Sequence, residues 1–189
     1  MPVDMRRWFL SRAARIIAQG GLVAYPTEAI YGIGCDPANE DAVTRLLALK
    51  QRSIDLGLIL IASDLDQVLP YIAPPTAAIM QRIGDSWPGP TTWLLPKRPD
   101  TPVWLCGRHD TLAVRITRHP LAAALCRRCN HALVSTSANR HGQVPARTAL
   151  KVRQYFDDAL DLILCGTTNR NARPSEIRDA RDGRIIRSA

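Results

Sequence analysis

In Ile16-Ile17-Ala18-Gln19-Gly20-Gly21-Leu22-Val23-Ala24-Tyr25-Pro26, the hydrophobic pattern of the chain changes from helical to extended. Apolar side chains before the two glycines share one face of a predicted helix over about residues 4–19, and the glycine pair ends that helix. The apolar run 22–25 predicts a buried strand, which Pro26 ends. A helix that leads directly into a buried strand indicates an α/β chain.

The alternation of helices and strands continues to the end of the chain. Further strands are predicted at 58–62, 91–95, 112–117, 132–135 and 160–165, further helices at 39–50, 119–129 and 148–156, and short helical segments from Asp64 and Pro75. The all-apolar run 58–62 is typical of a central strand. Asp182-Gly183 lies between two short strands and predicts a hairpin with a type I′ turn. The sheet is therefore expected to be mixed rather than purely parallel.

Length and composition predict one globular domain over residues 1–189. The contents of apolar residues (46%) and charged residues (22%) are near the average of globular proteins and exclude a disordered or fibrous chain. No stretch is apolar enough to span a membrane, and the run Trp8-Phe9-Leu10 after Arg6 and Arg7 is too short for an export signal. We therefore expect a cytoplasmic protein without a membrane anchor.

The five cysteines are expected to be free thiols, because the cytoplasm is a reducing compartment. Cys126 and Cys129 form a CxxC pair, but a structural zinc site needs further ligands at suitable spacing, so no metal site is predicted. The predicted helix places these two cysteines one turn apart. Cys35 follows the polar segment 27–34 and could be exposed, but no histidine lies nearby to activate it as a nucleophile. A redox role for these thiols stays open.

The formal net charge is +8, and lysine occurs only at positions 50, 97 and 151, so that 22 of the 25 basic residues are arginine. The planar guanidinium group binds phosphates and carboxylates in a bidentate manner, which suits an anionic ligand. A coding bias would give the same surplus. The basic balance is also consistent with contact to RNA.

Two polar segments follow predicted strands, where α/β folds commonly bind ligands. The segment 26–34 contains Thr27, Tyr31 and two glycines that would let backbone N–H groups approach a ligand, but it is equally consistent with a plain loop. The second segment is Ser135-Thr136-Ser137-Ala138-Asn139. Its small polar side chains suit phosphate oxygens, and they are equally typical of a helix cap or an Asx turn.

Three basic residues are further candidates. Lys50 and Arg52 lie at the C-terminal end of a predicted helix, where cations ordinarily stabilise the helix dipole. A lysine charge beside an arginine fork would also hold a carboxylate and a phosphate together. Arg115 lies on the second face of a predicted strand and needs an acceptor there, either a carboxylate of the chain or a nucleotide phosphate.

Taken in order, these motifs resemble the YrdC-like family of threonylcarbamoyl-AMP synthases. The resemblance covers nearly the whole chain from about Ala14 and has the length of the short bacterial form. It rests on Pro26-Thr27-Glu28 with Tyr31-Gly32, Lys50-x-Arg52, Ala113-Val114-Arg115, Ser135-Thr136-Ser137-Ala138-Asn139 and Pro174-Ser175.

The resemblance implies a twisted, open, mixed α/β sheet flanked by helices, with a basic concave face. It implies a nucleotidyltransferase that makes L-threonylcarbamoyladenylate from L-threonine, bicarbonate and ATP with release of pyrophosphate. The product would serve the threonylcarbamoyladenosine modification at adenosine 37 of tRNAs that read ANN codons, together with the proteins TsaB, TsaD and TsaE. By the same resemblance, the catalytic residues are Lys50, Arg52, Ser137 and Asn139, the threonine-side residues are Thr27 and Tyr31, and the nucleotide contacts are Arg115, Ser135, Thr136 and Ser175.

Two further expectations concern ATP. No protein cage for a metal is visible in the sequence, so Mg²⁺ is expected to arrive with ATP. Many family members carry a second lysine soon after the Lys-x-Arg motif, where this chain has Leu56. A neighbouring arginine is expected to replace that lysine, or else the triphosphate is held more weakly.

A different class of function remains open. The same basic concavity could bind double-stranded RNA or tRNA and assist ribosome maturation without any chemistry. A use of carbamoyl phosphate, as in related domains of hydrogenase maturation proteins, is less favoured because those domains lie in much larger chains.

Overall fold

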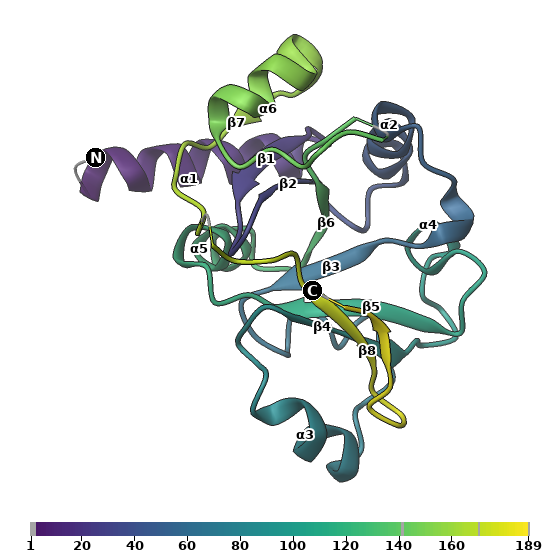
Figure 1. Cartoon of the computed structure of the whole chain (residues 1–189). Coiled ribbons are helices and arrows are strands. Elements are labelled where there is room, and N and C mark those ends of the chain that lie inside the picture. The colour runs from purple at the N-terminus through teal and green to yellow at the C-terminus, as the bar shows by residue number, and fades with distance from the viewer. Residues whose placement is uncertain (1–2, 141, 170, 189) are drawn as a thin grey trace.

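The computed structural model describes residues 3–140, 142–169 and 171–188, with the side chains of Val3 and Asp4 excepted. In this part of the chain, nine strands form one mixed sheet in the order β7-β1-β2-β6-β3-β5-β4-β8-β9 (Figure 1). The strands are β1 (Val23–Pro26), β2 (Tyr31–Gly34), β3 (Ile59–Ala62), β4 (Thr91–Pro96), β5 (Thr111–Ile116), β6 (Leu133–Ser137), β7 (Leu162–Ile163), β8 (Glu176–Asp179) and β9 (Ile185–Arg187). The helices are α1 (Val3–Ala18), α2 (Glu40–Lys50), α3 (Ala77–Gly84), α4 (Val103–Cys106), α5 (Pro120–Cys129) and α6 (Ala149–Phe156), with short 3₁₀ helices at Ile54–Leu56 and Asp157–Ala159.

Parallel and antiparallel pairs alternate irregularly across the sheet. β1 with β7, β3 with β5 and β4 with β8 are parallel, whereas β1–β2, β2–β6, β6–β3, β5–β4 and β8–β9 are antiparallel. The predictions of a mixed sheet and of a central strand at 58–62 are therefore confirmed.

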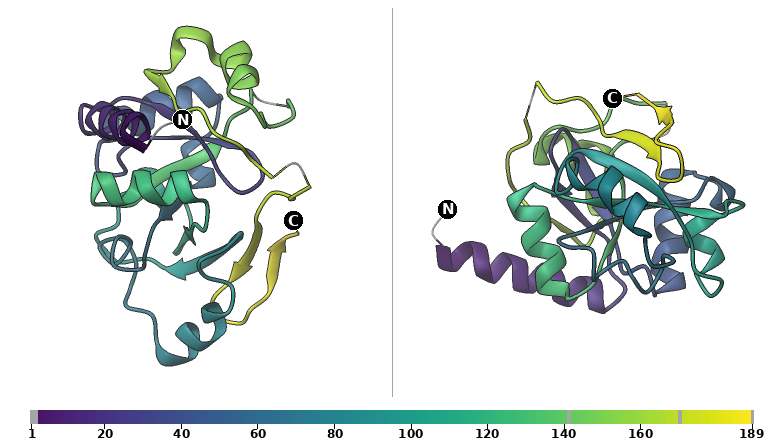
Figure 2. Two further views of the ribbon diagram at one scale, coloured as in Figure 1. Left: turned by 90° about the vertical axis from the view of Figure 1, so that its left-hand side faces the viewer. Right: turned by 90° about the horizontal axis from the view of Figure 1, so that it is seen from below.

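The two faces of the sheet pack against different helices. On β3, Leu60 and Ala62 belong to the large core cluster, which also contains side chains of α2, α3 and α6. The intervening Ile61 belongs to a smaller cluster with side chains of α1 and α5. In the left view of Figure 2, α1 and α5 accordingly lie together on one side of the molecule. Side chains of a strand point alternately to opposite faces, which explains this division.

The face under α1 and α5 continues past β3 onto β5 and β4. There, Leu112, Val114 and Ile116 of β5 point into the large core, so Ala113 and Arg115 point to the opposite face. Ala113 and Arg115 line a cavity instead of packing under a helix. The prediction that Arg115 lies on the second face of its strand is confirmed.

The sequence had predicted a loop over the whole segment 27–34, and this prediction is wrong for its second half. Its second half forms β2, which pairs with β1 on one side and with β6 on the other. Gly34 makes this close pairing possible, because a Cβ atom there would lie 2.2 Å from the carbonyl oxygen of Val134. Thr136 and Ser137 are likewise strand residues of β6 rather than loop residues.

Three further local predictions are wrong in part. The segment from Asp64 forms turns rather than a helix. The Asp64 side chain accepts a hydrogen bond from the backbone N–H of Gln67 (3.3 Å), which favours a turn. The strand predicted at 160–165 is reduced to β7. The hairpin between β8 and β9 is present, but only Gly183 of its turn has positive φ (82°), whereas a type I′ turn requires two such residues.

The cysteines are free thiols, as predicted. Cys126 and Cys129 lie on α5, as predicted. Cys35, which could have been exposed according to the sequence, is buried. Burial, assisted by Asp36, raises the pKa of Cys35 to about 12, so its thiol is not an activated nucleophile. No helix among the described residues is long and apolar enough to cross a membrane.

Candidate functional site

The cavity on the exposed part of the sheet has a volume of about 420 Å³, which is in the usual range of small-molecule sites. It is bordered by strands from both halves of the sheet and by the C-terminal segment of the chain. Eight of the predicted site residues line it: Thr27, Tyr31, Arg52, Arg115, Ser135, Thr136, Ser137 and Ser175. Lys50 and Asn139 do not line it, but both form hydrogen bonds with Ser137, which does.

Lys50 lies at the end of α2 and is buried. Its ammonium group donates hydrogen bonds to the backbone oxygens of Ser137 (2.6 Å) and Asn139 and to the side-chain oxygen of Asn139 (3.2 Å). Burial and the neighbouring Arg52 lower the pKa of Lys50 to about 8. The lysine therefore ties the end of α2 to the segment that follows β6, and its three donors have acceptors within the protein.

The side chains of Ser137 and Asn139 form a local network above this lysine. The Ser137 hydroxyl donates to Asn139 Oδ1 (2.6 Å), and Asn139 Nδ2 donates to the backbone oxygens of Arg140 and Gln143 (both 2.9 Å). Asn139 thus orients the Ser137 side chain at the cavity wall.

Thr27 and Tyr31 line the cavity beside β6, in and next to the neighbouring strand β2. The Thr27 hydroxyl donates to the backbone oxygen of Ile30 (2.7 Å), which closes the turn before β2. The Tyr31 hydroxyl donates to the backbone oxygen of Gly166 (2.8 Å) and accepts from its N–H (3.0 Å). Both hydroxyls are therefore engaged in the loops that border the cavity.

Arg115 finds its charge partner within the chain, a carboxylate, which is one of the two possibilities that the sequence left open. Its Nη2 lies 3.7 Å from Glu28 Oε2, which is an ion pair without a hydrogen bond. Arg115 Nε and Glu28 Oε2 are buried and have no hydrogen-bond partner. Burial acts to raise the pKa of Glu28, but Arg115 and hydrogen bonds from Thr117 and Arg118 outweigh it, and the pKa is lowered.

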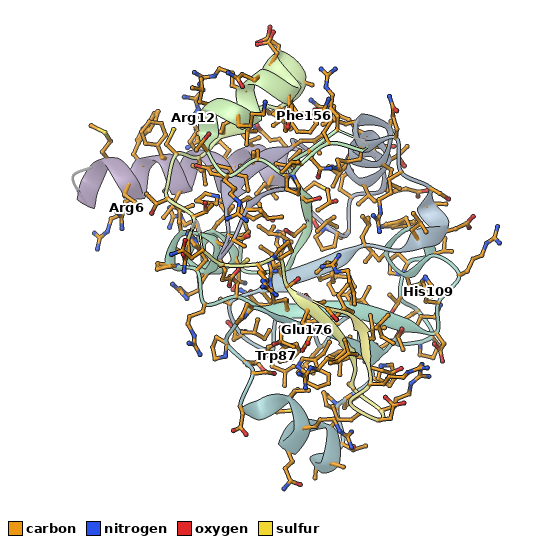
Figure 3. The ribbon with its side chains drawn as sticks, viewed as in Figure 1. Arg6, Arg12, Trp87, His109, Phe156 and Glu176 are labelled. Atoms are coloured by element: carbon orange, nitrogen blue, oxygen red, sulfur yellow. The ribbon has the colours of Figure 1, made fainter. Side chains whose placement is uncertain are left out.

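Arg173, Arg187 and His109 also line the cavity, and sequence reasoning missed all three. Arg187, the last residue of β9, donates to the backbone oxygen of Ser175 (2.8 Å). Burial, Arg115 and Arg52 together lower the pKa of Arg187, so these three guanidinium groups share one region. The surplus of arginine in the composition, and the expectation that a neighbouring arginine replaces the lysine missing at position 56, pointed to such residues without identifying them. His109 lies in the connection between α4 and β5 (Figure 3).

The charges around the cavity are unbalanced. Four arginines line it (Arg52, Arg115, Arg173 and Arg187), and Glu28 is the only carboxylate among the described lining residues. Such a site favours ligands with several negative charges. Within the described ranges, no group of three or more His, Cys, Asp or Glu side chains could hold a metal ion.

Comparison with known proteins gives a consistent result. The family model Sua5/YciO/YrdC, described as "Telomere recombination", matches residues 15–189. A threonylcarbamoyl-AMP synthase from Nitrosococcus oceani is 57% identical over 180 residues, which cover 95% of this chain and 97% of that protein. A protein of the same name from Halorhodospira halophila is 50% identical over 186 residues, which cover 98% and 97% of the two chains.

A solved structure shares the fold. The crystal structure of Sua5 from P. abyssi complexed with L-threonine aligns with a TM-score of 0.85 and 31% identity, and the alignment covers 91% of this chain and 51% of that one. The twisted, open α/β sheet expected from the sequence is thus confirmed.

Proposed function

The chain belongs to the Sua5/YciO/YrdC family, and from this membership and its arginine-lined cavity we propose that it is a threonylcarbamoyl-AMP synthase. The enzyme makes L-threonylcarbamoyladenylate from L-threonine, bicarbonate and ATP and releases pyrophosphate, as a nucleotidyltransferase. The observation that carries this proposal is identity of 57% over nearly the full length of a protein of that name, together with a cavity suited to polyanions.

The reaction has two steps that the site would assist. Bicarbonate takes up a proton and loses water to give CO₂, and the neutral amino group of threonine adds to CO₂ and releases a proton to form a carbamate. A carbamate oxygen then attacks the α-phosphorus of ATP as pyrophosphate leaves. Negative charge develops on phosphate oxygens in the second step, so positioning and neutralisation of charge matter more than a strong base. Arg52 at the cavity wall supplies such neutralisation, and Lys50 keeps the segment with Ser137 and Asn139 in place.

The remaining site residues have corresponding roles in this proposal. Ser135, Thr136 and Ser175 supply small hydrogen-bonding groups to the nucleotide, and Arg115 contacts an anionic group of a bound substrate. Thr27 and Tyr31 form the threonine side of the cavity through the loops that they hold together.

Leu56 lines the cavity where many family members carry a second lysine, and its side chain is largely exposed. Arg173 and Arg187 line the same cavity, and we propose that they take over the contacts of that lysine to the triphosphate. Mg²⁺ enters with ATP as part of the substrate. Residues 1–189 form a single domain of this family.

The product is used for the threonylcarbamoyladenosine modification of tRNAs that read ANN codons, downstream with TsaB, TsaD and TsaE in the cytoplasm. This destination extends the proposal beyond the cavity itself. No specific feature of the described residues favours a non-catalytic RNA-binding protein instead.

Pyrophosphate release tests the proposal. Purified protein is expected to release pyrophosphate from ATP only when threonine and bicarbonate are both present. Release that does not depend on threonine would refute the synthase. RNA binding without any ATP turnover would favour the RNA-binding alternative.

A further inference from the structure

The amino-acid substrate carries one group that the cavity does not obviously accommodate. ATP, bicarbonate and the carboxylate of threonine are all anionic and suit the four arginines of the cavity. The ammonium group of free threonine is cationic and would be repelled by them. Glu28 is the only described lining residue that offers a compensating carboxylate.

The two oxygens of Glu28 have different environments. Oε1 accepts hydrogen bonds from the Thr117 hydroxyl (2.7 Å) and from the backbone N–H of Arg118 (3.0 Å), which hold the carboxylate in place. Oε2 is buried without a hydrogen-bond partner, and Arg115, which forms an ion pair with it at 3.7 Å, lies too far away to donate a hydrogen bond. An unpaired buried acceptor of this kind is rare in native proteins and calls for an explanation.

The position of Glu28 is set by its backbone as well as by its side chain. It lies in the turn between Thr27 and Ile30, and its backbone oxygen accepts a hydrogen bond from the N–H of Asn169 (2.9 Å). The carboxylate is therefore held at a defined point of the cavity wall, while one of its oxygens has no hydrogen-bond partner.

We propose that Glu28 Oε2 binds the ammonium group of the amino-acid substrate, a role that rests on the proposed function. In the ligand-free protein, the Arg115 guanidinium lies over this oxygen, and Arg115 Nε also lacks a partner. An anionic group of a bound substrate draws Arg115 toward itself and frees Oε2 for the ammonium group. A zwitterionic substrate thus satisfies the unpaired acceptor and the unpaired donor together.

The experiment compares two ligands and two proteins. Glu28→Gln keeps an oxygen acceptor for Thr117 and Arg118 but removes the negative charge. Calorimetry measures the binding of L-threonine and of 3-hydroxybutyrate, which is threonine without its amino group, to the wild type and to the variant. We expect the wild type to prefer threonine by at least about tenfold, as for a charge-assisted hydrogen bond, and the variant to lose most of this preference.

A matched control is Glu176→Gln. Glu176 lies on β8 next to the cavity-lining Ile177 and pairs with Arg178, but it does not itself line the cavity (Figure 3). This control is expected to keep both the preference of the wild type for threonine and its KM for ATP.

An undiminished preference in Glu28→Gln, with an unchanged melting temperature, would overturn the inference. So would a wild type that binds the two ligands equally well. If the wild type still releases pyrophosphate in a threonine- and bicarbonate-dependent manner, only the role of Glu28 fails. If that release is absent, the proposed function fails and the inference falls with it.

Discussion

Arginines occur in two contrasting regions of this molecule, the cavity and the helix α1. In the cavity, burial and the proximity of Arg115 and Arg52 lower the pKa of Arg187. On α1, Arg6 and Arg12 are exposed, and the helix extends from the body of the protein toward the N-terminus (Figures 1 and 3). The same residue type is therefore crowded and partly desolvated in one region and solvated in the other.

This difference favours a ligand-binding role for the arginines of the cavity over those of α1. Like charges that are gathered in a cavity repel one another, and a bound anion relieves that repulsion. Solvated arginines on a helix reduce the stability of the protein little. The Arg12 guanidinium carbon even lies 5.6 Å from the centroid of the Trp8 ring, where the two groups attract each other. The family match begins only at Arg15, so most of α1 lies outside it. Cavity substitutions should therefore affect activity, and substitutions on α1 should not.

The largest effect is expected for Arg52→Ala. Loss of a group that neutralises charge in the transition state should lower kcat/KM by about 100-fold or more. The variant also loses the hydrogen bond from Arg52 Nη2 to the Gly57 backbone oxygen (2.9 Å), which should reduce the free energy of unfolding by only about 1 kcal/mol. Pyrophosphate release and urea unfolding measure the two quantities. Arg153→Ala on α6 is the control, and a similar loss of activity there would erase the contrast.

Lys50→Met should reduce both activity and stability. The substitution leaves the backbone oxygens of Ser137 and Asn139 without their shared donor. Loss of these charge-assisted hydrogen bonds in a partly buried region should lower the free energy of unfolding by about 2 kcal/mol, and the displaced Ser137 should lower kcat/KM by about tenfold. A variant with wild-type activity would show that this lysine does not position the site.

The pH dependence of the same lysine sharpens the contrast with solvated cations. Its folded-state pKa of about 8 lies below the ordinary value of 10.5, so the unfolded chain holds more protons between these two values. The stability of the wild type should therefore rise relative to Lys50→Met as the pH rises from about 8 to about 10.5. Activity should fall in this window, because the neutral amine donates one hydrogen bond fewer. Unfolding and kcat/KM measured on both proteins across this window would reveal a flat difference if Lys50 kept its ordinary pKa.

A smaller effect is expected for Leu56→Lys. Because 59% of the Leu56 side chain is exposed, a lysine fits there without disturbing the core. The added charge at the edge of the cavity should lower the KM for ATP about threefold, in line with the modest strength of exposed ion pairs. Leu56→Gln serves as the uncharged control. An unchanged KM in Leu56→Lys would indicate that Arg173 and Arg187 already neutralise the triphosphate fully.

The smallest effect is expected for the combined variant Arg6→Gln, Arg7→Gln and Arg12→Gln on α1. Its kcat/KM should stay within about twofold of the wild type, and each exposed substitution should change stability by no more than about 0.5 kcal/mol. A tenfold loss of pyrophosphate release would show that α1 contributes to the reaction, and the comparison of the two regions would then fail.

Helices and strands were predictable wherever their signal is local. The Asn39 cap, whose side chain accepts from the backbone N–H of Ala42, and the apolar run of β3 are both visible in a few consecutive residues. β2 was missed because glycine is unfavourable in most strands. The reason for Gly34 in this strand is its close contact with Tyr25 and with Val134, and Val134 lies far away in the sequence. The position of the turn before β9 was predicted correctly, but its type was not, because Asp182 lacks the positive φ that a type I′ turn requires.

The α/β class, the mixed sheet and the ordered motifs that carry the resemblance to the family can all be read from the amino-acid sequence. These features depend on periodicity and on short spacings, which are visible in consecutive residues. The tertiary structure was needed to show that Lys50 bonds to the segment after β6 instead of lining the cavity and that Arg187 lines it. Only it showed that Glu28 and Arg115 face each other with unpaired atoms. These contacts join segments that lie far apart in the sequence, and local patterns contain no information about which distant polar atoms remain without a partner.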